Sequence, residues 1–221
     1  MTPGSALGRM VARRAAAVAA AQVNVAVVIG ASTGGPKALG ALLATLPTNL
    51  PAYAFVVQHI HSSFSPALAR HLGRESALPV EEVRHGILAE PGRVYVAPGG
   101  RHLGLRRTRA GAVVLRLEDG PPVNGVRPSV DPLLMSAARS FGGRVIAVIL
   151  TGMGRDGLEG ARLVKQRGGI VLAEAEESCV VYGMPRALAE AGLADRVVPL
   201  ARMGQAVLEA LARLVERDGP Q

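Results

Sequence analysis

The stretch Val25-Ala-Val-Val-Ile-Gly-Ala-Ser-Thr-Gly-Gly-Pro36 decides how the rest of the chain is interpreted. A run of β-favouring apolar residues leads into Gly30, and a proline stands where a helix can begin. The stretch therefore predicts a buried parallel strand that breaks sharply into a helix. Within it, Gly30-Ala-Ser32-Thr-Gly34 fits the G-x-S-x-G elbow, in which glycines permit a tight turn that exposes a serine hydroxyl. The positive end of the following helix suits either a developing oxyanion or a bound phosphate.

The composition predicts a single globular domain with a core of small aliphatic side chains. The chain has 221 residues, of which 49% are hydrophobic and only 3% aromatic, and its mean hydropathy is +0.27. The net charge of +8 comes almost entirely from arginine, and no basic stretch is interleaved with aromatics, so we expect no nucleic-acid partner. Cys179 is the only cysteine, which excludes an internal disulfide and favours a reducing, cytoplasmic location.

The first 22 residues are expected to form a linker or N-terminal arm. Arginines at 9, 13 and 14 precede an alanine run, which resembles a signal peptide only faintly because alanine makes a weak apolar segment. No run of ~18 strongly apolar residues predicts membrane insertion. The sequence indicates no oligomeric state.

Strand-like and helix-like segments alternate along the rest of the chain. Such alternation predicts an α/β fold, with a doubly wound, mainly parallel sheet, helices on both faces and a β-hairpin excursion. We expect one domain over residues 23–217. The expected strands are 25–29, 53–57, 80–83, 93–97, 144–150, 169–173 and 197–198; the expected helices are 36–46, 65–72, 131–141, a segment ending at 167, 185–191 and 203–216; the hairpin comprises 102–107 and 112–117.

Three residues that suit acyl-transfer chemistry follow three of these strands. Ser32, His59 and Asp156 should meet at the carboxyl edge of the sheet, where α/β proteins gather functional groups. A serine nucleophile needs a base to take its proton, and the imidazole needs a carboxylate to orient it. Each residue alone is a weak signal, since a serine in a glycine turn, a histidine after a strand and an Asp-Gly pair are commonly structural. Their joint placement is far more specific.

Other kinds of site fit the residues less well. A dinucleotide fingerprint would lack its second glycine, and the next strand ends in Gln58-His59 instead of an acidic residue. The Gly-Lys-Ser/Thr of a P-loop is absent. His59 and His61 would share one strand face, but no cysteine or carboxylate cluster completes a metal site. We therefore expect neither a metal nor a cofactor.

The chain resembles the catalytic domain of the CheB family of chemotaxis protein-glutamate methylesterases. The resemblance covers roughly residues 24–200, in the family's order, and the combination of motifs is highly specific. It rests on Ile29-Gly-Ala-Ser-Thr-Gly-Gly35, Val57-Gln-His59, Pro91-Gly-Arg-Val-Tyr-Val-Ala-Pro98, Arg101-His102, Asp119-Gly-Pro121 with Arg127-Pro-Ser-Val-Asp131, Ile149-Leu-Thr-Gly-Met-Gly154 with Asp156-Gly157, and Glu177-Ser-Cys-Val-Val-Tyr-Gly-Met-Pro185.

The resemblance implies a serine hydrolase that demethylates, and also deamidates, the cytoplasmic helices of methyl-accepting chemotaxis receptors. It assigns the nucleophile to Ser32, the base to His59, the third triad position to Asp156, and oxyanion stabilisation to Thr33 and the Met153 N–H. The order Ser…His…Asp differs from that of α/β-hydrolases, so the elbow is a convergent likeness.

The remaining family-typical positions have structural interpretations. Cys179 is expected to be a small buried residue, and Asp131 and Arg127 to cap helices or pair. His85-Gly-Ile87 replaces an acidic pair that is usual in the family, which concerns surface contacts.

Regulation and the alternative to catalysis are the last points that the sequence raises. Too few residues precede Val25 to form the family's receiver domain, so we expect turnover to be indifferent to small phosphodonors. A degenerate, non-enzymatic domain that binds receptors or another signalling protein through the same cleft is the alternative function.

Overall fold

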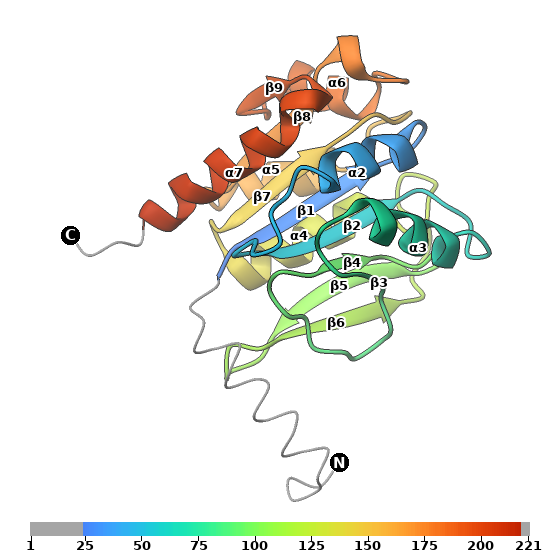
Figure 1. The fold of residues 1–221 in the computed structure, drawn as a ribbon, viewed down its shortest axis with the longest axis vertical. Coiled ribbons are helices and arrows are strands. Elements are labelled where there is room, and N and C mark those ends of the chain that lie inside the picture. Colours follow the sequence, from blue (N-terminus) through green and yellow to red (C-terminus); the bar gives the residue numbers. More distant parts are fainter. Residues whose placement is uncertain (1–23, 218–221) are drawn as a thin grey trace, which may run out of the picture.

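The computed structural model describes residues 24–217 and is built around a seven-stranded parallel sheet (Figure 1). The strand order is β3-β4-β2-β1-β7-β8-β9, so β1 is central and the chain winds outward in both directions from it. This topology confirms the predicted doubly wound α/β fold. The strands are β1 (Ala26–Ala31), β2 (Tyr53–Gln58), β3 (Val80–Glu82), β4 (Val94–Val96), β7 (Val145–Ile149), β8 (Ile170–Glu174) and β9 (Arg196–Val198).

Strand β1 is buried on both faces because helices cover both sides of the sheet. Successive side chains of a strand point to opposite faces, so Val27 and Ile29 pack into one hydrophobic cluster and Ala26 and Val28 into the other. Helices α2 (Gly35–Leu43), α3 (Ser65–Glu75) and α7 (Leu200–Glu216) contribute to the first cluster. Helices α4 (Val130–Phe141), α5 (Leu158–Gln166) and α6 (Met184–Glu190) contribute to the second.

The register of the central strands aligns their carboxyl ends. Ala31 of β1 lies opposite Gln58 of β2, and Gly30 lies opposite Ile149 of β7. The residues that follow these three strands therefore emerge side by side at one edge of the sheet. This alignment brings together the loops that carry Ser32, His59 and Asp156.

A separate antiparallel hairpin, the predicted excursion, covers the outer side of α4. It consists of β5 (His102–Arg107) and β6 (Val113–Glu118). Leu103, Leu105 and Leu115 of the hairpin belong to the same hydrophobic cluster as the buried residues of α4. The Ser136 hydroxyl of α4 accepts the Leu105 N–H at 3.0 Å. Helix α4 is thus packed between the sheet and the hairpin.

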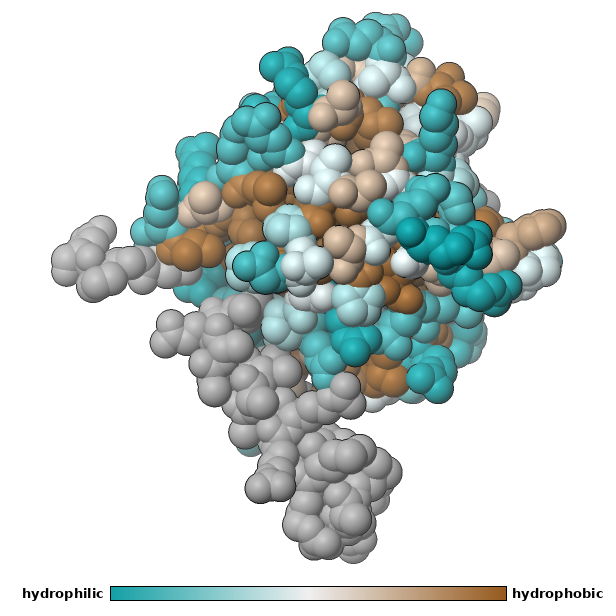
Figure 2. All heavy atoms as spheres, viewed as in Figure 1, coloured by the Kyte–Doolittle hydropathy of each residue, from teal (hydrophilic) through white to brown (hydrophobic). Residues whose placement is uncertain are grey.

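The boundaries of several elements differ from the expected ones by a few residues. Helix α2 ends at Leu43, α3 continues to Glu75, and α7 begins at Leu200, directly after Pro199. A short 3-10 turn, η1 (Glu176–Ser178), follows β8. The proposed arm over residues 1–22 lies outside the described residues, and residues 24–217 contain no helix long and apolar enough to cross a membrane. Hydrophilic residues cover most of the face in Figure 2, with apolar ones gathered beside α7.

Candidate active site

Ser32 leaves the end of β1 in a turn closed by backbone hydrogen bonds. Its N–H donates to Thr151 O at 3.0 Å, and its carbonyl accepts the Gly35 N–H at 2.8 Å. The positive φ needed by the turn falls on Gly34 (φ 84°), where a glycine has no Cβ to strain. Ser32 itself has no positive φ, so the strained serine of a nucleophile elbow is not found here. The serine is half-buried and remains accessible.

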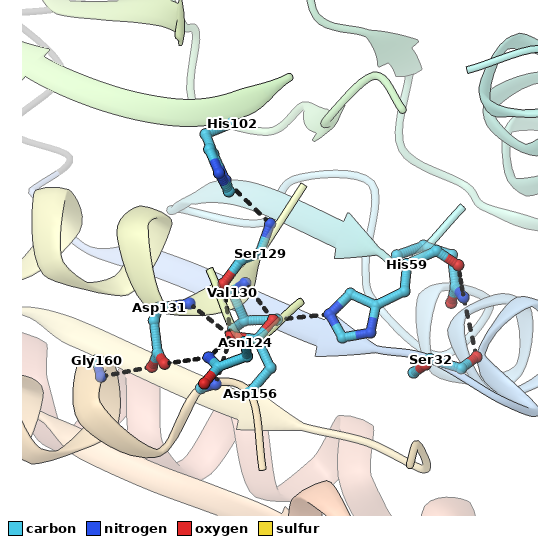
Figure 3. Close-up of polar contacts among 11 residues, drawn as sticks. Ser32, His59, His102, Asn124, Ser129, Val130, Asp131, Asp156 and Gly160 are labelled. Atoms are coloured by element: carbon cyan, nitrogen blue, oxygen red, sulfur yellow. Dashed lines mark hydrogen bonds and ion pairs between the residues drawn. The ribbon is translucent and has the colours of Figure 1, made fainter. Parts of the chain in front are cut away.

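His59 follows β2 and forms an ion-pair contact with Asp156. Its Nε2 lies 2.7 Å from Asp156 Oδ2, and the two side chains are 11% and 3% exposed. In Figure 3 the His59 ring lies between Asp156 and Ser32. Because Nε2 faces the carboxylate, Nδ1 is the ring atom left for the serine. Within the described residues no hydrogen bond joins Ser32 Oγ to the ring, as is common before a substrate tightens the site.

Gln58 ties the backbones of the two predicted catalytic residues together. Its Nε2 donates to Ser32 O at 2.9 Å and to His59 O at 3.0 Å. The side chain is 3% exposed, and its Oε1 has no hydrogen-bond partner among residues 24–217. Sequence motifs included Gln58 only as the residue before the histidine, so this positioning contact was missed.

Asp156 is held by an unusually complete set of donors. Its Oδ2 accepts from His59 and from the Val130 N–H at 2.7 Å, and its Oδ1 accepts from Ser129 Oγ at 2.6 Å. The Asn124 amide and the N–H groups of Asp131 and Gly157 also donate to Oδ1. Burial alone would raise the pKa of Asp156, but the hydrogen bonds from His59, Ser129 and Val130 outweigh it and lower that pKa. The carboxylate is therefore kept ionised.

Asp156 and Asp131 cap each other's helices. Asp156 precedes α5 and accepts N–H groups from the first turn of α4, whereas Asp131 lies in the first turn of α4 and accepts the Gly160 N–H of α5 at 2.7 Å. Burial raises the pKa of Asp131, and the nearby Asp156 charge adds to that effect against hydrogen bonds from Gly160 and Asn124. The capping role expected for Asp131 is thus present.

Other family-typical residues support the backbone around this pair. His102 accepts the Ser129 N–H on Nδ1 at 3.2 Å (Figure 3). Its Nε2 donates to Pro121 O at 3.0 Å, so the ring connects two loops. Arg127 donates to the Asp119 and Gly120 carbonyls. The roles of Asn124 and Ser129 were missed because only their contacts with residues far along the chain reveal them.

The predicted oxyanion residues lie on the loops that flank Ser32. Thr33 follows the serine, and its carbonyl accepts Thr151 Oγ1 at 2.9 Å. The backbone of Gly152 packs against Ser32, since a Cβ built at Gly152 would lie 2.6 Å from Ser32 Cβ. Met153 follows Gly152 in the chain and is 75% exposed. Its backbone N–H donates to no group among residues 24–217. A backbone N–H that is not otherwise used can donate a hydrogen bond to a developing oxyanion.

Two expectations about individual residues need correction. Cys179 is half-exposed instead of buried, because it follows the turn η1 near the surface, with its Sγ near Glu174 O. His61 does not share a strand face with His59, since β2 ends at Gln58 and the His61 ring contacts Ser63 Oγ at 2.9 Å. The part of the chain described contains no group of three or more His, Cys, Asp or Glu side chains arranged to hold a metal ion.

Comparisons with known proteins converge on one family. A family model described as "CheB methylesterase" matches residues 27–207. A protein from Anaeromyxobacter dehalogenans, named protein-glutamate methylesterase/protein-glutamine glutaminase 2, is 52% identical over 197 residues, which are 89% of this chain and 56% of that protein. One from Archaeoglobus fulgidus with the same name apart from the number is 43% identical over 195 residues, 88% of this chain and 56% of its own length.

A solved structure gives the same result for the fold. The CheB methylesterase catalytic domain of Thermotoga maritima is 46% identical, has a TM-score of 0.82, and is matched over 84% of this chain and 98% of that one. The chain spans about half the length of the curated relatives it matches.

Proposed function

Because this chain belongs to the CheB methylesterase family, we propose that it hydrolyses γ-glutamyl methyl esters on chemoreceptors, releasing methanol and restoring glutamate. Residues 23–217 would form the catalytic domain. The double name of the curated relatives supports deamidation of receptor glutamines as a second reaction of the same site. The partner would be the cytoplasmic helices of a methyl-accepting receptor, and the protein would act in the cytoplasm.

In the proposed first step, Ser32 Oγ attacks the ester carbonyl while His59 Nδ1 takes the serine proton. The 2.7 Å contact of Nε2 with Asp156 holds the ring in the tautomer whose Nδ1 is free, and the carboxylate stabilises the imidazolium that forms. His59 then returns the proton to the methoxide as it leaves as methanol. A water molecule, activated by the same ring, cleaves the acyl-enzyme and regenerates Ser32 and a glutamate carboxylate.

Backbone donors are proposed to stabilise the tetrahedral intermediate. The unused N–H of Met153, together with Thr33 beside the serine, would donate hydrogen bonds to the carbonyl oxygen and stabilise the negative charge that develops on it. The contact of Gly152 with Ser32 supports this assignment, because it keeps the Met153 N–H close to the reacting carbon.

The observation that carries the proposal is the buried His59–Asp156 pair beside an accessible serine. Asp156 also caps a helix, so the aspartate alone would not indicate catalysis; a domain that only binds receptors would not need a histidine paired with it next to an accessible serine. The binding-only alternative predicts receptor association without turnover, so an esterase assay separates the two functions.

The test is methanol release from a methylated receptor fragment. The wild-type protein should release methanol. Ser32→Ala should abolish release while the melting temperature stays near wild type, because the serine hydroxyl makes no hydrogen bond within residues 24–217. Cys179→Ser, which removes the other nucleophile of the loop region, should retain most of the rate. Near-native turnover by folded Ser32→Ala would overturn the mechanism, and receptor binding without any methanol release would favour the binding-only function.

A further inference from the structure

Asn124 lies at the tip of a two-residue turn that points its side chain at the predicted triad. Val123 and Val126 exchange N–H···O hydrogen bonds of 3.1 Å, and the residues between them, Asn124 (φ 54°) and Gly125 (φ 76°), both have positive φ. This is the geometry of a type I′ turn, for which Asn-Gly is the preferred pair. The two backbone hydrogen bonds close the turn, and the amide group projects from it toward Asp131 and Asp156.

The Asn124 amide nitrogen donates to two carboxylates at once. It lies 2.8 Å from Asp131 Oδ2 and 2.9 Å from Asp156 Oδ1 (Figure 3). An amide NH2 has two hydrogens, so each carboxylate receives one. Asp131 and Asp156 are 3% and 2% exposed, and one amide group reaches both carboxylates, so two buried like charges lie close together and repel each other. The shared donor offsets that repulsion.

We propose that Asn124 is a positioning residue for catalysis, which holds the Asp131 and Asp156 carboxylates side by side so that Asp156 keeps its other oxygen on His59 Nε2. The inference rests on the proposed function in so far as His59 is the base. Its physical basis is that the backbone donors on Asp156 come from the first turn of α4, the same turn that carries Asp131. Without the Asn124 donor, the repulsion between the two carboxylates would push Asp156 away from this turn and from the His59 ring.

The charged groups around the pair do not replace this donor. Asp131, Asn124 and the hairpin line a cavity of about 480 Å³. Its charged lining comprises Arg116, Glu118, Arg139 and Glu159 in addition to Asp131. All four of these side chains belong to exposed residues, and within residues 24–217 no hydrogen bond or ion pair joins any of them to Asp131 or Asp156. The cavity gives a small amide in solution a route to the place of the Asn124 side chain.

The alternative is that Asn124 serves only the turn. Asparagine, aspartate and glycine all tolerate a positive φ, so a turn-only role predicts that Asn124→Gly and Asn124→Asp behave like the wild type. The proposed role predicts that they differ. Glycine removes the shared donor, whereas aspartate removes it and adds a third carboxylate to a buried pair.

The experiment uses two readouts on the full chain. The first is the rate at which a fluorophosphonate labels Ser32; the serine Oγ–P bond forms, fluoride leaves, and the hydroxyl proton passes to His59. The second is the ¹H–¹⁵N spectrum of the histidine rings, which reports the His59 tautomer without any turnover. We expect labelling to fall about 10- to 100-fold in Asn124→Gly, as for the loss of one hydrogen bond to a charged group, and further in Asn124→Asp. The Nε2–H tautomer should lose population in the same order.

Two rescues distinguish a positioning role from a loss of local structure. Adding Asp131→Asn to Asn124→Gly removes the like charge while keeping an oxygen for the Gly160 N–H, so labelling should recover several-fold. Formamide, which fits the cavity, should also raise the rate of Asn124→Gly and leave the wild type unchanged. Gln205→Ala is the matched control, since it removes an exposed amide that donates to the Glu209 carboxylate on α7, and it should change neither readout.

The outcomes separate this inference from the proposed function. Wild-type labelling rates and His59 tautomer in folded Asn124→Gly and Asn124→Asp would overturn the positioning role. Equal losses in the two variants, with no recovery on adding Asp131→Asn or formamide, would also overturn it and leave a structural role. A wild-type protein that releases no methanol from receptor fragments would contradict the proposed substrate, while the tautomer order among the variants would still decide the role of Asn124.

Discussion

Replacing Gly152 by alanine should displace Ser32 through direct contact. A Cβ at position 152 would lie 2.6 Å from Ser32 Cβ, 3.1 Å from Ser32 N and 2.5 Å from Met184 Sδ. Gly152 cannot retreat easily, because its N–H donates to Val181 O at 3.0 Å and its carbonyl accepts the Met184 N–H at 2.8 Å. Carbon atoms in contact prefer about 3.5–4.0 Å, so the two loops must separate by roughly 1 Å.

That separation sets the size of the expected effects. Inserting a methyl group into a well-packed region costs about 1–3 kcal/mol, and each kcal/mol lowers the melting temperature of a domain of this size by roughly 2–4 °C. The effect on chemistry should be larger. A displacement of about 1 Å in a reacting group can cost ~100-fold in rate, so we expect a loss of that order in the fluorophosphonate labelling of Ser32.

The assay pairs thermal unfolding with the labelling rate, and Gly73→Ala is the matched control. Gly73 lies within α3, where an added Cβ would meet Val80 Cβ at an ordinary 3.7 Å, so the same substitution should stabilise the protein by about 0.5–1 kcal/mol and leave labelling unchanged. A Gly152→Ala protein with wild-type melting temperature and labelling would refute the steric argument. A lowered melting temperature with unchanged labelling would refute the transmission of strain to Ser32.

Three further predictions follow from the pKa directions. The folded-state pKa of Asp156 is lowered, so its contribution to stability is complete above about pH 4 and is lost as the pH falls through the lower folded value. The free energy of unfolding in urea should therefore fall less steeply with decreasing pH in Asp156→Asn than in the wild type. An unchanged pH dependence on the acid side would contradict this. The folded-state pKa of Asp131 is raised, so its contribution to stability is present below about pH 4 and is lost as the pH rises through that folded pKa. Asp131→Asn should therefore raise the melting temperature more at pH 7 than at pH 4. An equal change at both pH values would be inconsistent with a buried charge. Burial, reinforced by the Glu174 charge, raises the pKa of Cys179 to about 12, so iodoacetamide at pH 8 should alkylate this half-exposed thiol far more slowly than it alkylates free cysteine. Mass spectrometry of the labelled protein measures that rate, and alkylation as fast as that of the free amino acid would rule out the suppressed thiolate.

The sequence predicted the sheet well because its signals are local. Runs of β-branched residues mark buried strands, and glycine and proline mark their ends, so the stretch around Ser32 indicated both a buried parallel strand and the turn that follows it. Parallel winding then implied that residues following β1, β2 and β7 would meet. The fold class is confirmed, and the structure brings His59 and Asp156 into contact.

The supporting residues escaped because their roles depend on partners far along the chain. Asn124 donates across 32 residues to Asp156, Ser129 across 27, and Gln58 across 26 to Ser32. The Asn-Gly pair was a readable turn signal, but no local pattern indicates where a turn will aim its side chain. Cys179 shows the opposite error, since it was expected to be a small buried residue only because a serine already occupies the elbow, and its position after the turn η1 leaves it partly exposed.

Because α4 and α5 cap each other, the stability of a mutated chain depends on which of the proposed catalytic residues is changed. Loss of Ser32 or His59 removes a reactive group and leaves both helix ends satisfied, whereas loss of Asp156 strips acceptors from the first turn of α4. The second kind of chain would spend more time unfolded and be degraded sooner. Proteins with this fold that have lost catalytic activity should therefore keep the aspartate after the serine or the histidine has been replaced. In such a protein an intact Asp156 would indicate a requirement for stability and not an active enzyme.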